Sequence, residues 1–113
     1  MKIICFDIDG VICNNTWGKY ENAIPNMQAI KKINELYEQK FIIKLYTARF
    51  MGRNNEKVSK VYQTGFEFTK QQLEKWNIKY HELIMGKPSY DIIIDDKSIN
   101  YSKDWINEDF NLL

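Results

Sequence analysis

Cysteine, histidine and proline are scarce in this chain, which has two cysteines, one histidine and two prolines in 113 residues. Cys5 and Cys13 alone do not make a disulfide framework, and two thiols with one imidazole do not make a plausible zinc site. A modest hydrophobic core is feasible without such staples, because a chain of this length buries roughly 60–70% of its unfolded surface.

The sequence also lacks a long apolar run and an excess of charge of one sign. It has 16 basic and 15 acidic residues and no basic stripe, so no nucleic-acid partner is favoured. Its apolar runs are far shorter than the ~20 residues that span a bilayer, so no membrane partner is expected. Acidic residues arrive by position 7, unlike a secretory signal peptide. We therefore expect a cytoplasmic protein with a single domain over residues 1–113.

Strand-like apolar runs alternate with amphipathic helical patterns in the first half of the chain. Apart from Lys2, residues 2–6 are apolar with no alternation, which predicts a fully buried strand of a parallel sheet. From Pro25 to Lys40 apolar residues recur at helical spacing, and residues 41–46 form a second strand-like run. A strand, a helix and a strand in this order predict a right-handed crossover and a parallel pair.

The second half continues this alternation less regularly. Residues 56–76 favour helix, and a Thr-Gly pair at 64–65 leaves open whether there is one helix or two. Residues 80–85 are a weak strand candidate, residues 91–96 a strong one, and a last helix is expected at about 98–107. The predicted fold class is α/β, with a Rossmann-like parallel sheet of about four strands flanked by helices.

Polar groups follow the ends of these runs, at Asp7 and Asp9, Thr47, Lys87, and Asp95 with Asp96. If the strands are parallel and adjacent, these groups meet beyond the carboxyl ends of the sheet, where α/β proteins bind ligands. Carboxylates gathered there repel one another unless a hard cation binds them. Mg²⁺ suits this role because it takes few carboxylates and keeps waters for a phosphate. Thr47 and Lys87 offer the donors and the positive charge that a phosphoryl dianion needs.

This order of motifs resembles the haloacid dehalogenase (HAD) superfamily of Mg²⁺-dependent phosphohydrolases. The resemblance is carried by Asp7-Ile8-Asp9-Gly10-Val11, Leu45-Tyr46-Thr47, a lysine, and Ile93-Ile94-Asp95-Asp96. Each motif alone is weak, but the four in order at the ends of apolar runs are fairly specific. They bracket residues 7–96, which is most of the chain.

The resemblance implies a role for each matching residue. Asp7 would be the nucleophile that forms an aspartyl-phosphate, and Asp9 would protonate the leaving oxygen and then deprotonate the attacking water. Thr47 and the Ala48 N–H would hold the phosphoryl group. The implied Mg²⁺ ligands are Asp7, the Asp9 carbonyl and Asp95, with Asp96 behind them.

Two features leave alternatives open. The lysine that balances the phosphoryl charge is either Lys87, after the strand candidate at 80–85, or Lys70, at the position used in related deoxynucleotidases. Lys87 is favoured, and both are candidates for phosphate binding. About five residues join the strand candidates at 80–85 and 91–96, whereas a parallel crossover usually needs a dozen or more. The third strand is therefore either very short or placed elsewhere.

The expected elements leave no room for the cap domain that usually selects the substrate in this superfamily. An open site implies either a large substrate or a homo-oligomer that covers it. The stretch at 86–97 is most similar to small capless bacterial phosphatases of capsular polysaccharide biosynthesis. That similarity implies a sugar phosphate or a similar small phosphorylated substrate.

Two other functions use similar motifs. A 5′-nucleotidase or polynucleotide end-phosphatase shares the core, and Trp17 or Tyr20, in an expected flap at 11–24, would then stack on a base. A phosphorylation-dependent receiver domain also has paired acids, a threonine and a lysine. Its phosphoacceptor, however, ends a central strand where this chain has Thr47.

The role of Arg49 stays open: its side chain either binds substrate or faces solvent.

Overall fold

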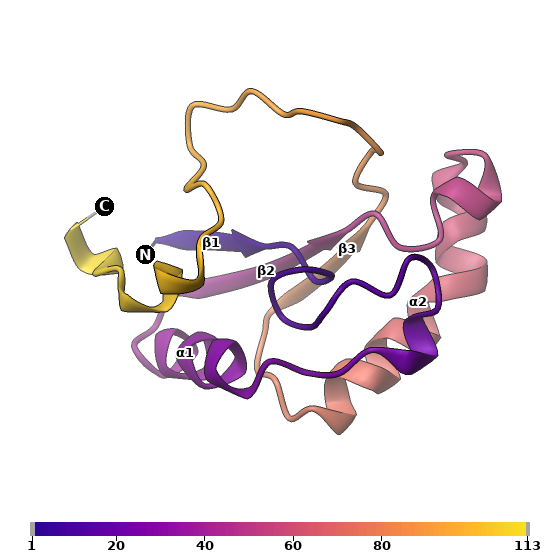
Figure 1. The fold of residues 1–113 in the computed structure, drawn as a ribbon. Coiled ribbons are helices and arrows are strands. Elements are labelled where there is room, and N and C mark those ends of the chain that lie inside the picture. Colours follow the sequence, from indigo (N-terminus) through magenta and orange to yellow (C-terminus); the bar gives the residue numbers. More distant parts are fainter. Residues whose placement is uncertain (1, 113) are drawn as a thin grey trace.

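A parallel sheet forms the centre of the computed structural model, which describes residues 2–112 (Figure 1). Its three strands, in the order β1-β2-β3, are β1 (Ile3–Phe6), β2 (Ile42–Thr47) and β3 (Glu82–Met85). Phe6 lies beside Leu45, and Leu45 lies beside Leu83, so the carboxyl ends of the strands meet at one edge. This arrangement confirms the parallel α/β fold and the weak strand predicted at 80–85.

Two helices connect the strands and lie along one face of the sheet (Figure 1). Helix α1 spans Met27–Glu38, and its N-cap is Asn26, whose side chain accepts the Ala29 N–H at 3.2 Å. Helix α2 spans Val58–Lys75. Right-handed crossovers that advance across a sheet in one direction place both helices on the same side. No helix in the described part of the chain combines the length and apolar character that crossing a membrane needs.

Helix α2 is one continuous helix, so the Thr-Gly pair does not break it. Gly65 is buried where α2 approaches the ring of Phe50. A Cβ atom at position 65 would lie 2.3 Å from that ring, so only glycine permits this contact. Packing against Phe50 therefore offsets the roughly 1 kcal/mol that glycine costs within a helix.

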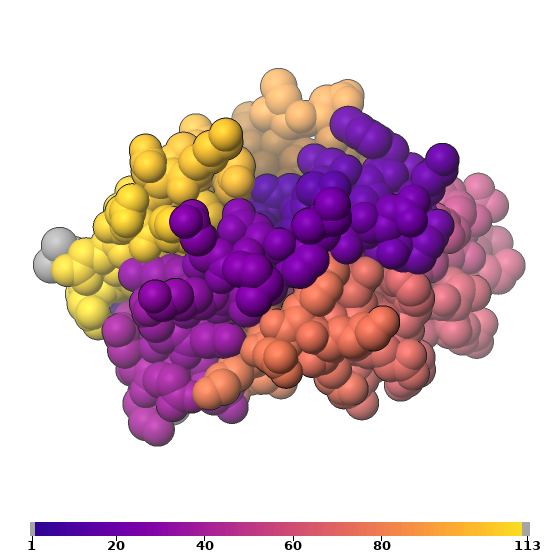
Figure 2. Space-filling view, turned by 60° about the horizontal axis from the view of Figure 1, so that its bottom comes forward, coloured from indigo at the N-terminus to yellow at the C-terminus, as the bar shows by residue number. Residues whose placement is uncertain are grey.

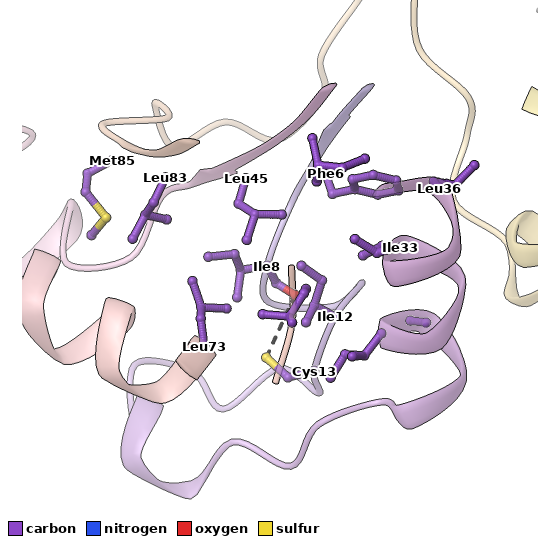
Figure 3. Close-up of a cluster of buried hydrophobic side chains, with 14 of the residues drawn as sticks. Phe6, Ile8, Ile12, Cys13, Ile33, Leu36, Leu45, Leu73, Leu83 and Met85 are labelled. Atoms are coloured by element: carbon purple, nitrogen blue, oxygen red, sulfur yellow. Dashed lines mark hydrogen bonds between the residues drawn. The ribbon is translucent and has the colours of Figure 1, made fainter. Parts of the chain in front are cut away.

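The hydrophobic core lies between the sheet and the two helices (Figure 3). Buried side chains that meet there include Phe6, Leu45 and Leu83 from the strands and Ile33, Leu36 and Leu73 from the helices. Each contributes roughly 1.5–3 kcal/mol when fully buried. In Figure 2 the surface of the loop after β1 lies between the C-terminal segment and α2. Packing in the core thus fixes the position of the strand ends, where the polar residues of the predicted site lie.

No helix among residues 2–112 covers the opposite face of the sheet. Along β2 the half-buried residues of this face alternate with the buried residues of the helix face. On β1, Ile3 is 60% exposed and Cys5 is also exposed. The prediction that residues 2–6 form a fully buried strand is therefore wrong. Parallel sheets bury both faces only when helices lie on both sides, and here both helices take the same side.

The strand predicted at 91–96 is absent, so the sheet has three strands rather than about four. Residues 88–102, hereafter the arm, contain no helix or strand and leave the body as an arch (Figure 1). Every residue of the arm is exposed, and Ile94 is 98% exposed. The connection from β3 is too short for a parallel crossover within one chain, which explains why this apolar run does not join the sheet.

The helix expected at about 98–107 is reduced to the 3₁₀ helix η3 (Lys103–Asn107), and η4 (Phe110–Leu112) follows it. Trp105 is buried, with its ring centroid 5.3 Å from that of Phe6. The Lys2 ammonium donates to the Phe110 carbonyl at 3.2 Å. The chain therefore returns to the body beyond the arm and is attached beside β1.

Candidate active site

Asp7 and Lys87 meet at the carboxyl edge of the sheet. Asp7 follows β1 directly, and its Oδ1 accepts the Ile8 N–H at 2.8 Å. The Lys87 ammonium lies 3.4 Å from Asp7 Oδ2. The Lys87 backbone N–H donates to the Thr47 carbonyl at 3.1 Å, which attaches the segment after β3 to the end of β2. The structure therefore brings the favoured lysine to the predicted nucleophile.

Burial and charge act in opposite directions on this pair. Burial raises the pKa of Asp7 by more than the Lys87 charge and the Ile8 N–H lower it. Burial lowers the pKa of Lys87, but Asp7 and Tyr90 outweigh it, so the Lys87 pKa is raised. Lys87 is therefore an ammonium at neutral pH, with a side chain only 16% exposed. Such a cation offsets negative charge most strongly where water is partly excluded.

Asp9 is held by Arg49, whose side chain is fully buried. Arg49 Nε donates to Asp9 Oδ2 at 2.8 Å, and Nη2 donates to Asp9 Oδ1 at 3.0 Å. This bidentate geometry is typical of an ion pair between an arginine and a carboxylate. The sequence left Arg49 open between substrate binding and solvent, and the structure excludes a solvent position because the side chain is buried against Asp9.

Contacts with Gln72 and Tyr20 also hold the Arg49 side chain in place. Its Nη1 donates to Gln72 Oε1 at 2.6 Å, and Gln72 Nε2 donates to the Tyr20 carbonyl at 2.8 Å. The guanidinium also lies over the Tyr20 ring, 4.8 Å from its centroid. The sequence did not point to Gln72 as a site residue. No local pattern identifies its role, because its partners are 23 and 52 residues away.

Cys13 packs against the same carboxylate. Its Sγ lies 3.4 Å from Asp9 Oδ1, and Arg49 Nη2 is 3.6 Å from the sulfur. Burial, with the Asp9 charge, raises the Cys13 pKa to about 12. The thiol is therefore protonated at neutral pH and donates to its acceptors, which include the Ile8 carbonyl (Figure 3).

Thr47 and Ala48 lie beside the acidic pair at the end of β2. Thr47 is fully buried, and its Oγ1 accepts the Arg49 N–H at 3.0 Å. Because that bond uses Oγ1 as an acceptor, the hydroxyl hydrogen remains available to donate.

An open hollow of about 250 Å³ gives access to this edge. It is lined by Asp7, Asp9, Asn15, Thr16, Trp17, Gly18, Tyr20, Ala48 and Arg49. The lining residues Asn15–Gly18 and Tyr20 belong to the flap expected at 11–24, so that segment does lie above the strand ends. Trp17 is 92% exposed.

Three predicted site residues make no ion pair or hydrogen bond with this cluster within residues 2–112. Lys70 is in α2, and no ion pair within residues 2–112 joins it to Asp7 or Asp9. Asp95 and Asp96 are exposed residues of the arm, and Asp95 Oδ1 accepts the Lys97 N–H at 2.8 Å. Their separation follows from the missing fourth strand, which was expected to end beside Asp7.

The predicted Mg²⁺ ligands do not come together within one chain. Asp7 offers one carboxylate and Asp9 its backbone carbonyl, but Asp95 and Asp96 are exposed residues of the arm. In the part of the chain that the structure describes, no three His, Cys, Asp or Glu side chains are grouped closely enough to hold a metal ion. A single chain in this conformation therefore does not assemble the ligands of the predicted Mg²⁺ site.

Comparison with known proteins supports the fold. No protein-family model and no curated protein matches this sequence. A crystal structure of a protein from Vibrio cholerae superposes with a TM-score of 0.81 at 25% identity, over 95% of this chain and 94% of that one.

Two further solved structures share the same core. D,D-heptose 1,7-bisphosphate phosphatase from B. bronchiseptica, complexed with magnesium and phosphate, matches with a TM-score of 0.51 at 15% identity. This chain has a HAD-like fold. The match covers 75% of this chain and 49% of the heptose bisphosphate phosphatase. A chain of the Pnkp1/Rnl/Hen1 complex matches with a TM-score of 0.54 at 17% identity, over 88% of this chain and 30% of that one. At these identities the matches establish the fold and not the reaction.

Proposed function

We propose that this chain is a phosphomonoester hydrolase that acts through an aspartyl-phosphate on Asp7. The observation that carries the proposal is the Asp7–Lys87 pair, 3.4 Å apart at the carboxyl edge of a parallel sheet, where Asp7 lines an open hollow. A carboxylate beside a partly buried ammonium suits attack on a phosphoryl group, because the cation offsets the charge of both reactants. The HAD-like fold, shared with a heptose bisphosphate phosphatase, supports the same reaction class.

The proposed reaction has two steps. An Asp7 oxygen attacks phosphorus, the bond from phosphorus to the leaving oxygen breaks, and that oxygen takes up a proton. Water then attacks the aspartyl-phosphate, which releases phosphate and restores the Asp7 carboxylate. Throughout, Lys87 offsets negative charge, while the Thr47 hydroxyl and the Ala48 N–H donate to phosphoryl oxygens.

Asp9 is proposed as the group that gives and takes these protons. Both of its oxygens accept hydrogen bonds from Arg49 in the structure. Each carboxylate oxygen keeps a second lone pair, and Asp9 lines the hollow, so Asp9 can exchange a proton there while Arg49, held by Gln72 and Tyr20, keeps it in place. Arg49 acts here as a positioning residue, because it reaches the reacting atoms only through Asp9.

Mg²⁺ belongs to the proposal, although one chain does not complete its site. The heptose bisphosphate phosphatase with this fold was solved with magnesium and phosphate. Chelation is therefore expected to abolish activity, and Mg²⁺ to restore it.

The proposed substrate is a sugar phosphate or a similar small intermediate of capsular polysaccharide biosynthesis. A hollow of about 250 Å³ suits a small metabolite. A nucleotide is the second candidate, because Trp17 lines the hollow with 92% of its surface exposed and a face free for stacking. Comparing Trp17→Ala with wild type on sugar phosphates and on nucleotides separates the two. A loss confined to nucleotides would identify a nucleotidase.

The reaction is tested by hydrolysis of an aryl phosphate in the presence of Mg²⁺. Asp7→Asn is expected to lower kcat by at least about 1,000-fold, because an amide is a poor nucleophile. Asp104→Asn, at an exposed acid in η3, is the matched control and should keep the wild-type rate. Wild-type turnover by Asp7→Asn would exclude the proposed nucleophile.

A further inference from the structure

The arm presents apolar side chains that stay exposed against the rest of residues 2–112. Ile92, Ile93 and Ile94 are 82%, 54% and 98% exposed. The flanking apolar residues Tyr90, Ile99 and Tyr101 are also exposed. A contiguous apolar segment of this kind marks an interaction site in a soluble domain. The run is rich in β-branched residues, so an extended strand is the conformation it favours.

Strand β1 has an edge that is available to pair with such a segment. It is an edge strand, and within residues 3–6 its only ladder partner is β2. Its far edge therefore offers backbone donors and acceptors to another strand. Ile3 and Cys5 are exposed on the uncovered face beside this edge. Both the strand and the arm thus have unpaired backbone and unburied apolar side chains.

The arm cannot reach this edge in its own chain in the orientation that brings Asp95 to Asp7. In that parallel register Asp91 lies level with Ile3, and hence with Ile42 of β2. Lys87, attached to Thr47, is about 16 Å away along the strand and about 10 Å across two strand spacings. The four residues from Lys87 to Asp91 span at most about 14 Å.

We infer that the arm docks as a fourth strand on β1 of a second copy of this chain, and that the two copies exchange arms reciprocally. Each arm would then bury its isoleucines against the partner's sheet, and each β1 would gain a ladder partner. Reciprocal exchange closes a two-fold dimer, in which each chain both gives and receives one arm. The superposition with the Vibrio cholerae chain leaves 5% of 113 residues, about six, unmatched. It therefore extends into the fifteen-residue arm, so about nine or more arm residues lie within the matched part of this chain.

The exchange also completes the active site, and this part rests on the proposed phosphatase function. With arm and β1 parallel, Asp95 of one copy comes level with Asp7 of the other. A site with Asp7, the Asp9 carbonyl and Asp95 offers the oxygen ligands that Mg²⁺ prefers and that a single chain lacks. The open site is then shared between two copies.

Disulfide trapping tests the docking without any assay of activity. In the inferred register Ile93 lies beside Cys5 on the same face of the sheet, whereas Ile94 points to the other face. Under mild oxidation Ile93→Cys should form covalent dimers through Cys5, and the matched variant Ile94→Cys should not. Adding Cys5→Ser to Ile93→Cys should abolish the covalent dimer. Wild-type protein that stays monomeric by light scattering at all concentrations, or equal trapping by both variants, would overturn the inference.

Mixing two inactive variants tests whether the site is shared. Asp7→Asn and Asp95→Asn, unfolded and refolded together, form mixed dimers in which one site has both native carboxylates. Random pairing should restore about a quarter of the wild-type rate, whereas either variant alone stays inactive. An active wild-type monomer would overturn arm exchange but not the phosphatase proposal. A dimer that is trapped as expected but has no phosphatase activity would overturn the proposed function but not the exchange.

Discussion

Two stretches of this chain look alike in sequence and differ completely in structure. Residues 3–9 and 92–96 each join an apolar run to a pair of acids. The first stretch forms β1 and delivers Asp7 and Asp9 to an organised cluster. The second stretch is an exposed part of the arm, with Asp95 in a local turn. The difference shows that such a pattern specifies a preference for strand, whereas a neighbouring strand within reach decides whether one forms.

The largest difference in the free energy of unfolding is expected between an aliphatic residue of the sheet and one of the arm. Leu45 of β2 is fully buried, so Leu45→Ala should lower the free energy of unfolding by about 2–5 kcal/mol at every protein concentration. Ile94→Ala in the arm should change it by less than about 0.5 kcal/mol in dilute protein and should weaken the dimer. Denaturant unfolding at two concentrations measures both. Equal losses at high dilution would mean that the arm is packed within its own chain.

The next contrast concerns two arginines close together in sequence. Arg49→Met removes a buried cation and leaves Asp9 and Gln72 without their partner, which should cost about 2–4 kcal/mol. Arg53 is exposed and contacts the Gly18 carbonyl, so Arg53→Met should cost less than about 0.5 kcal/mol. Chemical denaturation of the two variants compares them. A small effect of Arg49→Met would show that Asp9 is solvated without its partner.

The two thiols give a further measure of the same contrast. Cys13 is buried and its pKa is raised to about 12, so iodoacetamide should not modify it at neutral pH. Cys5 is exposed in the single chain, and the arm of a partner should cover it in the dimer. A variant with both Ile92→Ser and Ile94→Ser should therefore expose Cys5, which should react at least about tenfold faster than Cys13. Mass spectrometry of the labelled peptides identifies the modified thiol. Faster labelling of Cys13 would contradict the burial of the Asp9 cluster.

The smallest expected effect is the contribution of Asp7 to the pH dependence of folding stability. Because the folded chain raises the Asp7 pKa above its ordinary value of 3.8, the folded state keeps this proton to higher pH than the unfolded state does. The stabilisation from Asp7 is therefore full below pH 3.8 and is lost as the pH rises through the folded pKa. Asp7→Asn cannot ionise and should be slightly more stable than wild type at pH 7, relative to the same comparison at pH 3. Thermal unfolding at both pH values measures this difference, and a loss at pH 7 would show that the ion pair with Lys87 outweighs burial.

Some features could be predicted because their signals are local. The apolar run before Asp7, the helical spacing between Pro25 and Lys40 and the short run before Lys87 each predicted an element that the structure contains. A parallel sheet then brings Asp7 and Lys87 to one edge.

Other features depended on partners far away in the sequence. Phe50 packs against Gly65 and so keeps α2 continuous. Arg49 takes both oxygens of Asp9, a contact across 40 residues that no spacing rule contains.

The sequence by itself determined the parallel α/β fold and the position of Asp7 at a strand end, since periodicity and strand order follow from local chemistry. Only the tertiary structure decided where Ile92 to Asp96 lie. The physical reason is reach, because the few residues after β3 do not extend to β1 of the same chain. Chain length between elements, and not the apolar character of the run, separates the arm from the sheet that it resembles.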